Sequence, residues 1–425
     1  MSKVSKLVSS VSKKIIKPYS PTPISLRCHK LSFLDQLICC IHTPIVLFYP
    51  KLSNTWSNKP SNVVSQHLEK SLSKVLTNYY PLAGELNDNI SVDCNDNGVE
   101  FFTTKIDCPM SEFLNDPYAD KHNIVYPNGV PNAYSYKGSL AVFQLSHFNC
   151  GGIAISICFS HKIADGYTLC NFTNHWATIA RNPMSSEILP MAPQFNGASY
   201  FPPIKEDLSH KTFIPELETE KYLIKSFYFS SSKLAALKAR VINQSEVQNP
   251  TDTEVVSAFI YQRAMATKKV VTSTLYQALS LRPPLPKNTM GNNVSPYSIH
   301  TKDEKEMGLP QIVGKLRKAK EELRKKYKNA QPNEFLYIAQ DAVNEKIFNS
   351  SSSNFYMSST IKFPFYDADF GWGKPEKVCI PLKNMFVLMD TKNRDGVEVI
   401  SGMKEQDMLA FERDEELLQF ASPSS

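Results

Sequence analysis

GGIAISICFSHKIADG, residues 151–166, joins an alternating apolar segment to a histidine, an aspartate and a glycine. Its larger side chains fall on every second position, which is the period of a β-strand. After Gly166 the apolar residues recur at intervals of three or four, which predicts an amphipathic helix. His161 is therefore expected at the point where a strand gives way to a helix. The large strand residues are Ile153, Ile155, Ile157 and Phe159.

Residues 140–148 predict a second strand, and Asn149, Cys150 and two glycines supply the turn of a hairpin between the two strands. A histidine at the exit of a strand can meet a substrate, and a neutral imidazole accepts a proton readily near neutral pH. A structural role for this histidine is the alternative that the spacing leaves open. Asp165 can likewise be the N-cap of the following helix, where its side chain accepts a backbone N–H.

A catalytic Ser-His-Asp arrangement that uses Ser160 as nucleophile is the chemical rival. Neighbouring residues of a strand point to opposite faces, so Ser160 is poorly placed to use His161. The chain also contains no GxSxG motif, which marks the nucleophile of α/β-hydrolases. A general base therefore fits this segment better than a serine nucleophile.

A second motif, DFGWG, occupies residues 369–373, and a lysine and a proline follow it. Its glycines indicate a tight loop, which we expect between strands at residues 359–366 and 385–390. HxxxD followed by DFGWG resembles the plant BAHD acyltransferases, which transfer an acyl group from coenzyme A to an alcohol or an amine. Other family landmarks occur in order: Ile16-Lys17-Pro18, Leu34-Asp35-Gln36, Tyr80-Pro81-Leu82-Ala83-Gly84, Ser280-Leu281-Arg282 and Met290-Gly291-Asn292.

The resemblance covers essentially the whole chain and is strongest to the clade that holds vinorine synthase and capsaicin synthase. It implies an α/β fold of two similar domains like chloramphenicol acetyltransferase, with mixed sheets flanked by helices and a channel between them. Prolines at residues 183–218 exclude a continuous helix or central strand. We therefore expect an N-terminal domain at 1–185 carrying HxxxD, a crossover linker at 186–218, and a C-terminal domain at 219–425 carrying DFGWG.

The resemblance also implies roles for individual residues. His161 is expected to be the general base, and Asp165 to support it structurally by pairing with Arg282. The acid and the glycines of DFGWG are expected to shape the loop. The chemistry of the reaction adds a second expectation, because a tetrahedral oxyanion needs hydrogen-bond donors, and the indole N–H of the tryptophan and backbone N–H groups nearby are the candidates. The loop residues concerned are Asp369, Gly371, Trp372 and Gly373.

Coenzyme A contacts are expected at Ser358, Ser359 and Lys362, which match the hydroxyl and basic positions before DFGWG. Many family members have arginine where this chain has Lys362, and lysine lacks the planar fork that binds a phosphate through two hydrogen bonds. Exposure of these side chains to water without any ligand is the alternative.

The positive charge of the chain is concentrated in one predicted helix. Residues 315–328 hold eight basic residues and two acids, a balance of +6 that equals the net charge of all 425 residues. The basicity therefore does not indicate a nucleic-acid-binding protein. These charges can form a solvated helix face, or they can attract the phosphates of coenzyme A.

Composition limits the remaining possibilities. Nine cysteines without a CxxC pair argue against a disulfide framework and against a metal site. No run approaches the about 18 apolar residues of a membrane span. Residues 1–17 are rich in Ser and Lys and lack acids, as in a transit peptide, but residues 4–16 can instead form a first strand. We expect a cytoplasmic monomer without membrane or nucleic-acid partners.

The predicted function is that of an acyl-CoA-dependent O-acyltransferase of plant specialised metabolism. Acetyl-CoA or another short-chain acyl-CoA is expected as co-substrate, with a small-molecule acceptor such as an alkaloid, terpenoid, sugar or phenolic. We expect no permanently bound cofactor and no metal. Two alternatives stay open, an N-acyltransferase that acts on an amine and a catalytically silent relative that binds a metabolite.

Overall fold

The computed structural model describes residues 7–38, 41–115, 123–127, 139–182, 191–205, 221–348 and 353–424. The chain forms two compact units, each built from several segments of sequence. The first unit comprises residues 1–215, 285–293 and 364–380, and the second comprises residues 216–284, 294–363 and 381–425.

This division corrects the predicted domain at 219–425, because two of its segments belong to the first unit. One is residues 364–380, which hold DFGWG and end in a strand that pairs with the first unit's sheet. The other is residues 285–293. Much of the predicted linker at 186–218 lies outside the described residues, and residues 191–205 belong to the first unit and contain the short helix α7 (Gly197–Tyr200).

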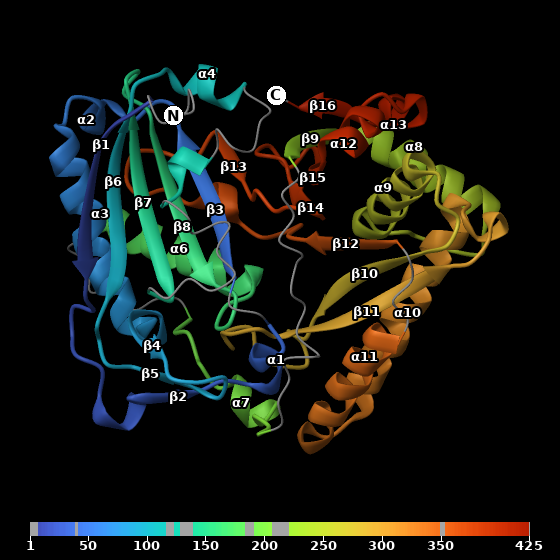
Figure 1. Ribbon diagram of the computed structural model, residues 1–425, viewed down its shortest axis with the longest axis horizontal. Helices are drawn as coiled ribbons and strands as arrows, with labels where there is room; N and C mark the ends of the chain where they lie inside the picture. The colour runs from blue at the N-terminus through green and yellow to red at the C-terminus, as the bar shows by residue number, and fades with distance from the viewer. Residues whose placement is uncertain are drawn as a thin grey trace. The chain divides into compact units, whose positions relative to one another are not determined.

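The first unit is built on a six-stranded sheet with the order β1-β6-β7-β8-β3-β13 (Figure 1). β6 and β7 are parallel, and the other neighbouring pairs are antiparallel, so the sheet is mixed. A three-stranded sheet with the order β2-β5-β4 also belongs to this unit. The strands are β1 (Val8–Ile16), β2 (Cys28–Lys30), β3 (His42–Tyr49), β4 (Glu85–Leu86), β5 (Ser91–Asp93), β6 (Val99–Ile106), β7 (Ala141–Phe148), β8 (Ile153–Ser160) and β13 (Lys377–Cys379).

The predicted hairpin and helix are confirmed as β7, β8 and α6 (Gly166–Arg181). All of β8 is buried because both faces of the sheet are covered. Its large residues face α6, where Phe159 packs against Phe172. Its small residues, among them Ala154 and Cys158, face a cluster that includes Phe113 of α4 (Met110–Leu114). The alternation of large and small side chains thus reflects two different neighbouring layers.

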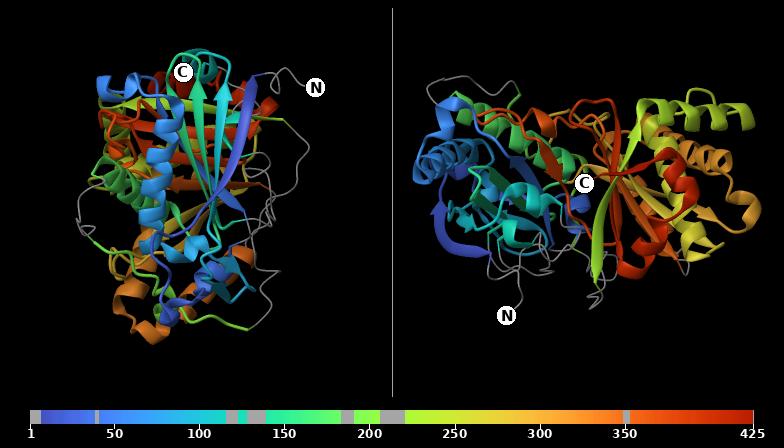
Figure 2. Two further views of the ribbon diagram at one scale, coloured as in Figure 1. Left: turned by 90° about the vertical axis from the view of Figure 1, so that its left-hand side faces the viewer. Right: turned by 90° about the horizontal axis from the view of Figure 1, so that it is seen from above.

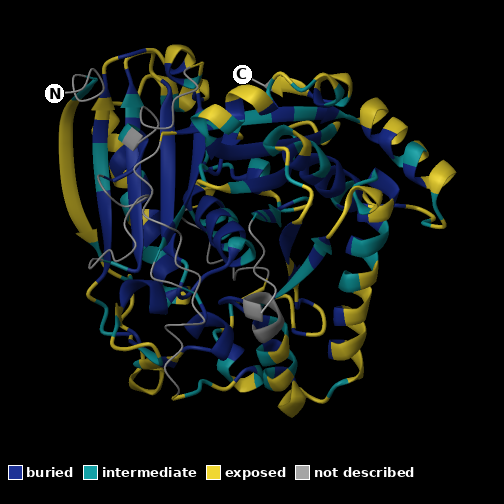
Figure 3. Cartoon of the chain, turned by 45° about the vertical axis from the view of Figure 1, so that its right-hand side comes forward, coloured by how far each residue is buried: buried dark blue, intermediate teal, exposed yellow. Residues whose placement is uncertain are grey.

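Of the two edge strands of the first unit's sheet, β1 is exposed and β13 is largely buried. Among the described strands β1 pairs with β6 alone, and it is exposed along most of its length (Figure 3). The helix α3 (Ser61–Asn78) packs against β1 and α6 (Figure 2). The strand predicted at residues 4–16 is confirmed from Val8 onward, whereas residues 4–6 lie outside the described residues. The other helices of this unit are α1 (Phe33–Gln36), α2 (Asn54–Ser57), and the 3-10 turns Ile24–Leu26, Tyr80–Ala83, Asn123–Val125 and Phe365–Asp367.

The second unit is built on a seven-stranded mixed sheet with the order β11-β10-β12-β14-β15-β9-β16. The central strands β10, β12 and β14 are parallel to one another. The strands are β9 (Tyr222–Ser230), β10 (Ser273–Ser280), β11 (Val294–Thr301), β12 (Asn354–Ser359), β14 (Met385–Asp390), β15 (Gly396–Lys404) and β16 (Ser422–Ser424). The helices are α8 (Ser231–Gln244), α9 (Asp252–Lys268), α10 (Leu309–Asn329), α11 (Phe335–Phe348), α12 (Glu405–Phe411) and α13 (Glu415–Phe420), with 3-10 turns at Glu304–Glu306 and Pro332–Glu334.

In the second unit, the predicted basic helix is present and the strand predicted at residues 359–366 is not. The basic helix is confirmed as α10, which buries the side chains of Leu316, Leu323 and Tyr327. The strand predicted at 359–366 is wrong, since β12 ends at Ser359 and the chain turns through Lys362, whose φ is 71°. In the described part of the chain, no helix is both long enough and apolar enough to cross a membrane.

Candidate active site

His161 is the first residue after β8, and its backbone is fixed beside the start of β3. Its N–H donates to the carbonyl oxygen of Ile41 at 2.7 Å, and the preceding residue, Ser160, pairs with His42 of β3. The side chain of His161 is only partly buried, in contrast to its strand neighbours. The strand end therefore holds the backbone rigidly while part of the imidazole stays accessible.

Asn292 determines which nitrogen of the imidazole carries the proton. Its side-chain Nδ2 donates to the backbone oxygen of His161 at 2.6 Å, and its Oδ1 lies 3.0 Å from His161 Nδ1. Because Oδ1 can only accept, Nδ1 must carry the hydrogen in the neutral ring. The unprotonated nitrogen is then Nε2, which is the atom available to take a proton from a substrate.

Asp165 is the N-cap of α6 and is buried. Its Oδ1 accepts hydrogen bonds from the backbone N–H and the hydroxyl of Thr168, each at 2.9 Å. Its Oδ2 accepts from the backbone N–H of Asn293 at 3.1 Å. The carboxylate thus fastens the start of α6 to residues 289–293, the segment that carries Asn292. The pairing of Asp165 with Arg282 stays a prediction.

Residues 289–293 have a role at this site that was not predicted from the sequence. The only signal was the resemblance of Met290-Gly291-Asn292 to a family landmark, which carries no role by itself. In the structure, Gly291 has a φ of 101°, a left-handed conformation that favours glycine. The side-chain Nδ2 of Asn293 binds the carbonyl oxygens of Thr289 and Met290. These contacts fix the backbone conformation of residues 289–293, and this conformation places the side chain of Asn292 against His161.

The DFGWG loop lies far from His161, although both belong to the first unit. Asp369 is 4.0 Å from Arg181, the last residue of α6, whereas His161 precedes the first turn of that helix. A helix of 16 residues is about 24 Å long. Trp372 packs against Tyr49, at the end of β3 opposite to the end beside His161. The suggested role of the Trp372 indole as oxyanion donor at His161 is therefore wrong.

The loop is instead held in a structural aromatic cluster. Oδ1 of Asp369 accepts from the backbone N–H groups of Gly371 and Gly373 at 2.8 and 2.9 Å. Both glycines have a positive φ, 109° and 114°, a conformation that glycine adopts without strain. Burial, with the charge of Asp369 adding to it, raises the pKa of the Tyr49 hydroxyl far above its ordinary value. The rings in the cluster are Tyr49, Trp56, His67, Trp176, Phe370 and Trp372.

Asp369→Ala should lower stability without changing the chemistry. Two backbone donors lose a charged acceptor, and a hydrogen bond to a charged group contributes about 1.5–3 kcal/mol, less where the donor is exposed, as at Gly373. We expect a loss of about 2–4 kcal/mol, seen as a lower thermal midpoint, and an unchanged kcat for the folded fraction. Lys374→Ala is the control from the same loop, because its ion pair with Asp367 is exposed and should matter little. A folded Asp369→Ala enzyme without activity would contradict this assignment.

The residues predicted to contact coenzyme A lie in the second unit, and they do not share one face. Ser359 and Lys362 line a pocket with a volume of about 430 Å³. Met357 and Ser359 of β12 both point into it, so Ser358 between them points to the opposite face of the strand. Ser358 therefore does not line this pocket. Ser359 Oγ is 3.4 Å from the hydroxyl of Thr253, at the start of α9.

Four cationic side chains line the same pocket: Lys238, Lys320, Arg324 and Lys362. Lys238 is paired with Asp252 at 2.7 Å, and Lys320 is paired with the buried carboxylate of Glu254. Burial alone would raise the pKa of the Glu254 carboxyl, but hydrogen bonds from Arg317 and Lys320 outweigh it and lower the pKa to about 2. Two positive charges, on Arg324 and Lys362, are therefore left without a carboxylate partner among the described residues.

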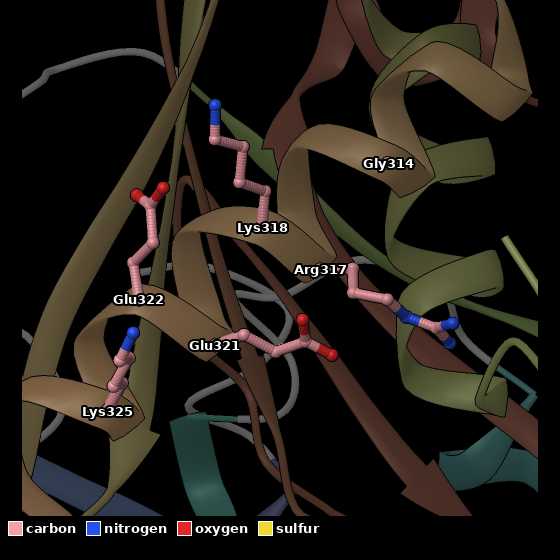
Figure 4. A pocket seen from close by; sticks show the side chains of 6 residues that line it. All are labelled: Gly314, Arg317, Lys318, Glu321, Glu322 and Lys325. Carbon is pink, nitrogen blue, oxygen red and sulfur yellow. The ribbon is translucent and has the colours of Figure 1, made fainter. Parts of the chain in front are cut away.

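The face of α10 that does not line this pocket carries both acidic and basic side chains. Figure 4 shows a shallow hollow on this helix that is lined by both signs of charge. Arg317 points from it toward the neighbouring helix, where it binds Glu254 at 2.7 Å. This mixture of charges is typical of a solvated helix face. The residues of the hollow are Gly314, Arg317, Lys318, Glu321, Glu322 and Lys325. Within the described ranges, no three His, Cys, Asp or Glu residues lie close enough to hold a metal ion.

Solved structures identify the fold. The crystal structure of vinorine synthase superposes with a TM-score of 0.82 and 33% sequence identity, covering 98% of both chains. The complex of F. graminearum TRI101 with coenzyme A and deoxynivalenol has a TM-score of 0.71 at 17% identity, covering 93% of this chain and 99% of that one. The class is thus a two-sheet mixed α/β acyltransferase fold, with helices flanking both sheets.

Sequence comparison gives the family. Residues 6–418 match the Transferase family. Acylsugar acyltransferase 3 of Solanum lycopersicum is 42% identical, with 97% of each chain covered. Acyltransferase Pun1 of Capsicum frutescens is 41% identical, with 98% of each chain covered. The chain belongs to the Transferase family and is a BAHD acyltransferase, which confirms the resemblance drawn from HxxxD and DFGWG.

Proposed function

We propose that this enzyme transfers an acetyl or other short acyl group from coenzyme A to a hydroxyl of a small-molecule acceptor. The observation that carries the proposal is the hydrogen bond between Asn292 Oδ1 and His161 Nδ1, which leaves Nε2 as a proton acceptor on a partly exposed ring. Relatives that cover nearly the whole chain support O-transfer, among them stemmadenine O-acetyltransferase of Catharanthus roseus, which is 35% identical. Together these features favour a hydroxyl acceptor and His161 as base.

The reaction requires only one proton carrier. Nε2 of His161 removes the hydroxyl proton as the acceptor oxygen attacks the thioester carbonyl carbon, which gives a tetrahedral oxyanion. When the carbon–sulfur bond breaks, the departing thiolate takes the proton back from Nε2. The products are an ester and free coenzyme A, and no acyl-enzyme forms. Asp165 contributes by fixing the backbone on either side of the site, with Arg282 as its proposed second partner.

The pocket of the second unit fits the phosphate end of the donor. Arg324 and Lys362 supply two positive charges that have no carboxylate partner in the described part of the chain, and a phosphate monoester carries a charge between about −1.5 and −2 near pH 7. Thr251, Asp252 and Thr253 at the start of α9 line the same pocket. We therefore assign the pocket to the 3′-phosphate of coenzyme A, with Ser359 at its wall.

Arg324→Ala and Lys362→Ala should each raise the KM for the acyl donor about fivefold, since one exposed charge contact contributes about 1 kcal/mol. The kcat should not change, because the contact is equal in ground and transition states. Lys318→Ala is the matched control, since it removes the same charge from the other face of α10. A donor that lacks the 3′-phosphate should show no difference between wild type and variants. Equal effects of Lys318→Ala and Arg324→Ala would contradict the assignment.

Release of free thiol tests the proposed function as a whole. The enzyme is incubated with short acyl-CoA donors and a panel of alcohols and amines, and products are identified by mass. An amine acceptor is the second candidate, because an N-malonyltransferase of Strychnos nux-vomica is 36% identical to the chain. Acceptor-dependent thiol release supports a transferase, and the product mass separates esters from amides. Binding of acyl-CoA without any turnover across the panel would instead support a catalytically silent relative.

A further inference from the structure

Asp35 is a buried carboxylate that the proposed mechanism does not use. It lies in α1 and has an exposed fraction of 3%. Its Oδ2 accepts from the backbone N–H and the hydroxyl of Ser32 at 2.8 and 2.7 Å, which closes the N-terminal capping box of the helix. Its Oδ1 points the other way, to residues 289–293. A capping role explains only half of these contacts.

The second oxygen of Asp35 holds Asn292 at two points. Oδ1 accepts from the backbone N–H of Asn292 at 2.8 Å and from its side-chain Nδ2 at 2.9 Å. Nδ2 has two hydrogens, and the other one goes to the backbone oxygen of His161. Both partners of Nδ2 are acceptors without a proton to give, so turning the amide over would set its oxygen against two oxygens. The amide therefore has one stable orientation.

The orientation of the Asn292 amide determines which ring nitrogen of His161 carries the hydrogen. With Oδ1 of Asn292 facing Nδ1, the neutral ring of His161 must carry its hydrogen on Nδ1 and present a free lone pair on Nε2. If the amide were loose, the ring could adopt the other tautomer, in which Nε2 carries the hydrogen and cannot act as a base. When His161 takes up a proton, the carboxylate behind the amide also stabilises the positive ring through the hydrogen-bond chain.

We infer that Asp35 is a positioning residue that acts on His161 through Asn292 and keeps the base in its reactive tautomer. Hydrogen bonds connect Asp35 to Asn292 and Asn292 to His161. They link three segments that are far apart in sequence but belong to one unit. The backbones of Asn292 and His161 are also hydrogen-bonded, to Asp35 Oδ1 and to the carbonyl oxygen of Ile41 respectively, which holds both residues in place. The effect on turnover rests on His161 being the proposed base, whereas the effect on the tautomer does not.

Asp35→Ala tests the inference by two measurements. We expect kcat to fall about 10- to 100-fold with both KM values unchanged, because the base is misoriented for part of the time. In enzyme labelled with ¹⁵N-histidine, the ring signal of His161, identified by its loss in His161→Gln, should change from pure Nδ1–H to a mixture containing Nε2–H. Ser32→Ala is the matched control, since it weakens the same helix cap and leaves the contact with Asn292 intact. It should keep wild-type kcat and tautomer.

Asn292→Ala extends the test and replaces it if Asp35→Ala does not fold. Because Asp35 acts through Asn292, the double variant should be no slower than Asn292→Ala alone. Additive losses, or a pure Nδ1–H signal in Asn292→Ala, would overturn the inference. If His161→Ala kept full activity while the tautomer still shifted in Asp35→Ala, the proposed role of His161 as base would fail, and the effect of Asp35 on the tautomer would stand.

Discussion

His161→Ala should lower kcat by about 10²- to 10⁴-fold, the range that a positioned general base contributes. Without Nε2, the acceptor hydroxyl must lose its proton to water while it attacks the thioester. The KM of the acyl donor should stay the same, because the proposed phosphate contacts lie in the other unit. The measurement is the rate of acceptor-dependent thiol release at saturating donor and acceptor.

The variant must be shown to be folded, and His147→Ala provides the matched control. His147 also lies on the first unit's sheet, on β7, but it pairs with Ile153 at the opposite end of β8 from His161. A strand of eight residues separates the two ends by about 23 Å. His147→Ala should therefore keep its activity, and both variants should unfold near the wild-type temperature. Thiol release by His161→Ala at the wild-type rate would show that the base is a different group.

The sequence predicts the elements around His161 well because their signals are local. The alternation in residues 153–160 has the period of a strand, and the spacing after Gly166 has the period of a helix. The capping role of Asp165 follows from the same local pattern. In each case the neighbours in sequence are also the neighbours that decide the conformation, so no knowledge of the tertiary structure is needed.

The parts that could not be predicted depend on contacts between distant segments. Asn292 is 131 positions from His161, and nothing in either segment indicates that they meet. The position of DFGWG beside Arg181 likewise follows from residues 364–380 joining the first unit. Ser358 and Ser359 are adjacent residues of the same type, so the sequence does not distinguish them. Because neighbouring side chains of a strand point to opposite faces, only Ser359 lines the pocket. Such pairings need the topology of both sheets.

Asp165→Ala should reduce stability rather than only the chemical step. The substitution removes the N-cap of α6, which costs about 0.5–2 kcal/mol, and leaves the buried N–H of Asn293 without its acceptor, which costs about 1–3 kcal/mol. A total of about 1.5–5 kcal/mol is a large part of the typical stability of about 5–15 kcal/mol of a folded protein. We expect a lower yield of folded protein and a lower thermal midpoint, measured by thermal unfolding.

Asp165→Asn separates a structural role of this residue from a chemical one. The amide keeps one oxygen for the backbone N–H of Thr168, but its NH₂ group then meets the N–H of Asn293, donor against donor. The stability of this variant should therefore lie between those of wild type and Asp165→Ala. Because Asn292 rather than Asp165 binds Nδ1 of the imidazole, folded Asp165→Asn should retain far more activity than His161→Ala. A folded Asp165→Asn enzyme as slow as His161→Ala would mean that the aspartate takes part in proton transfer.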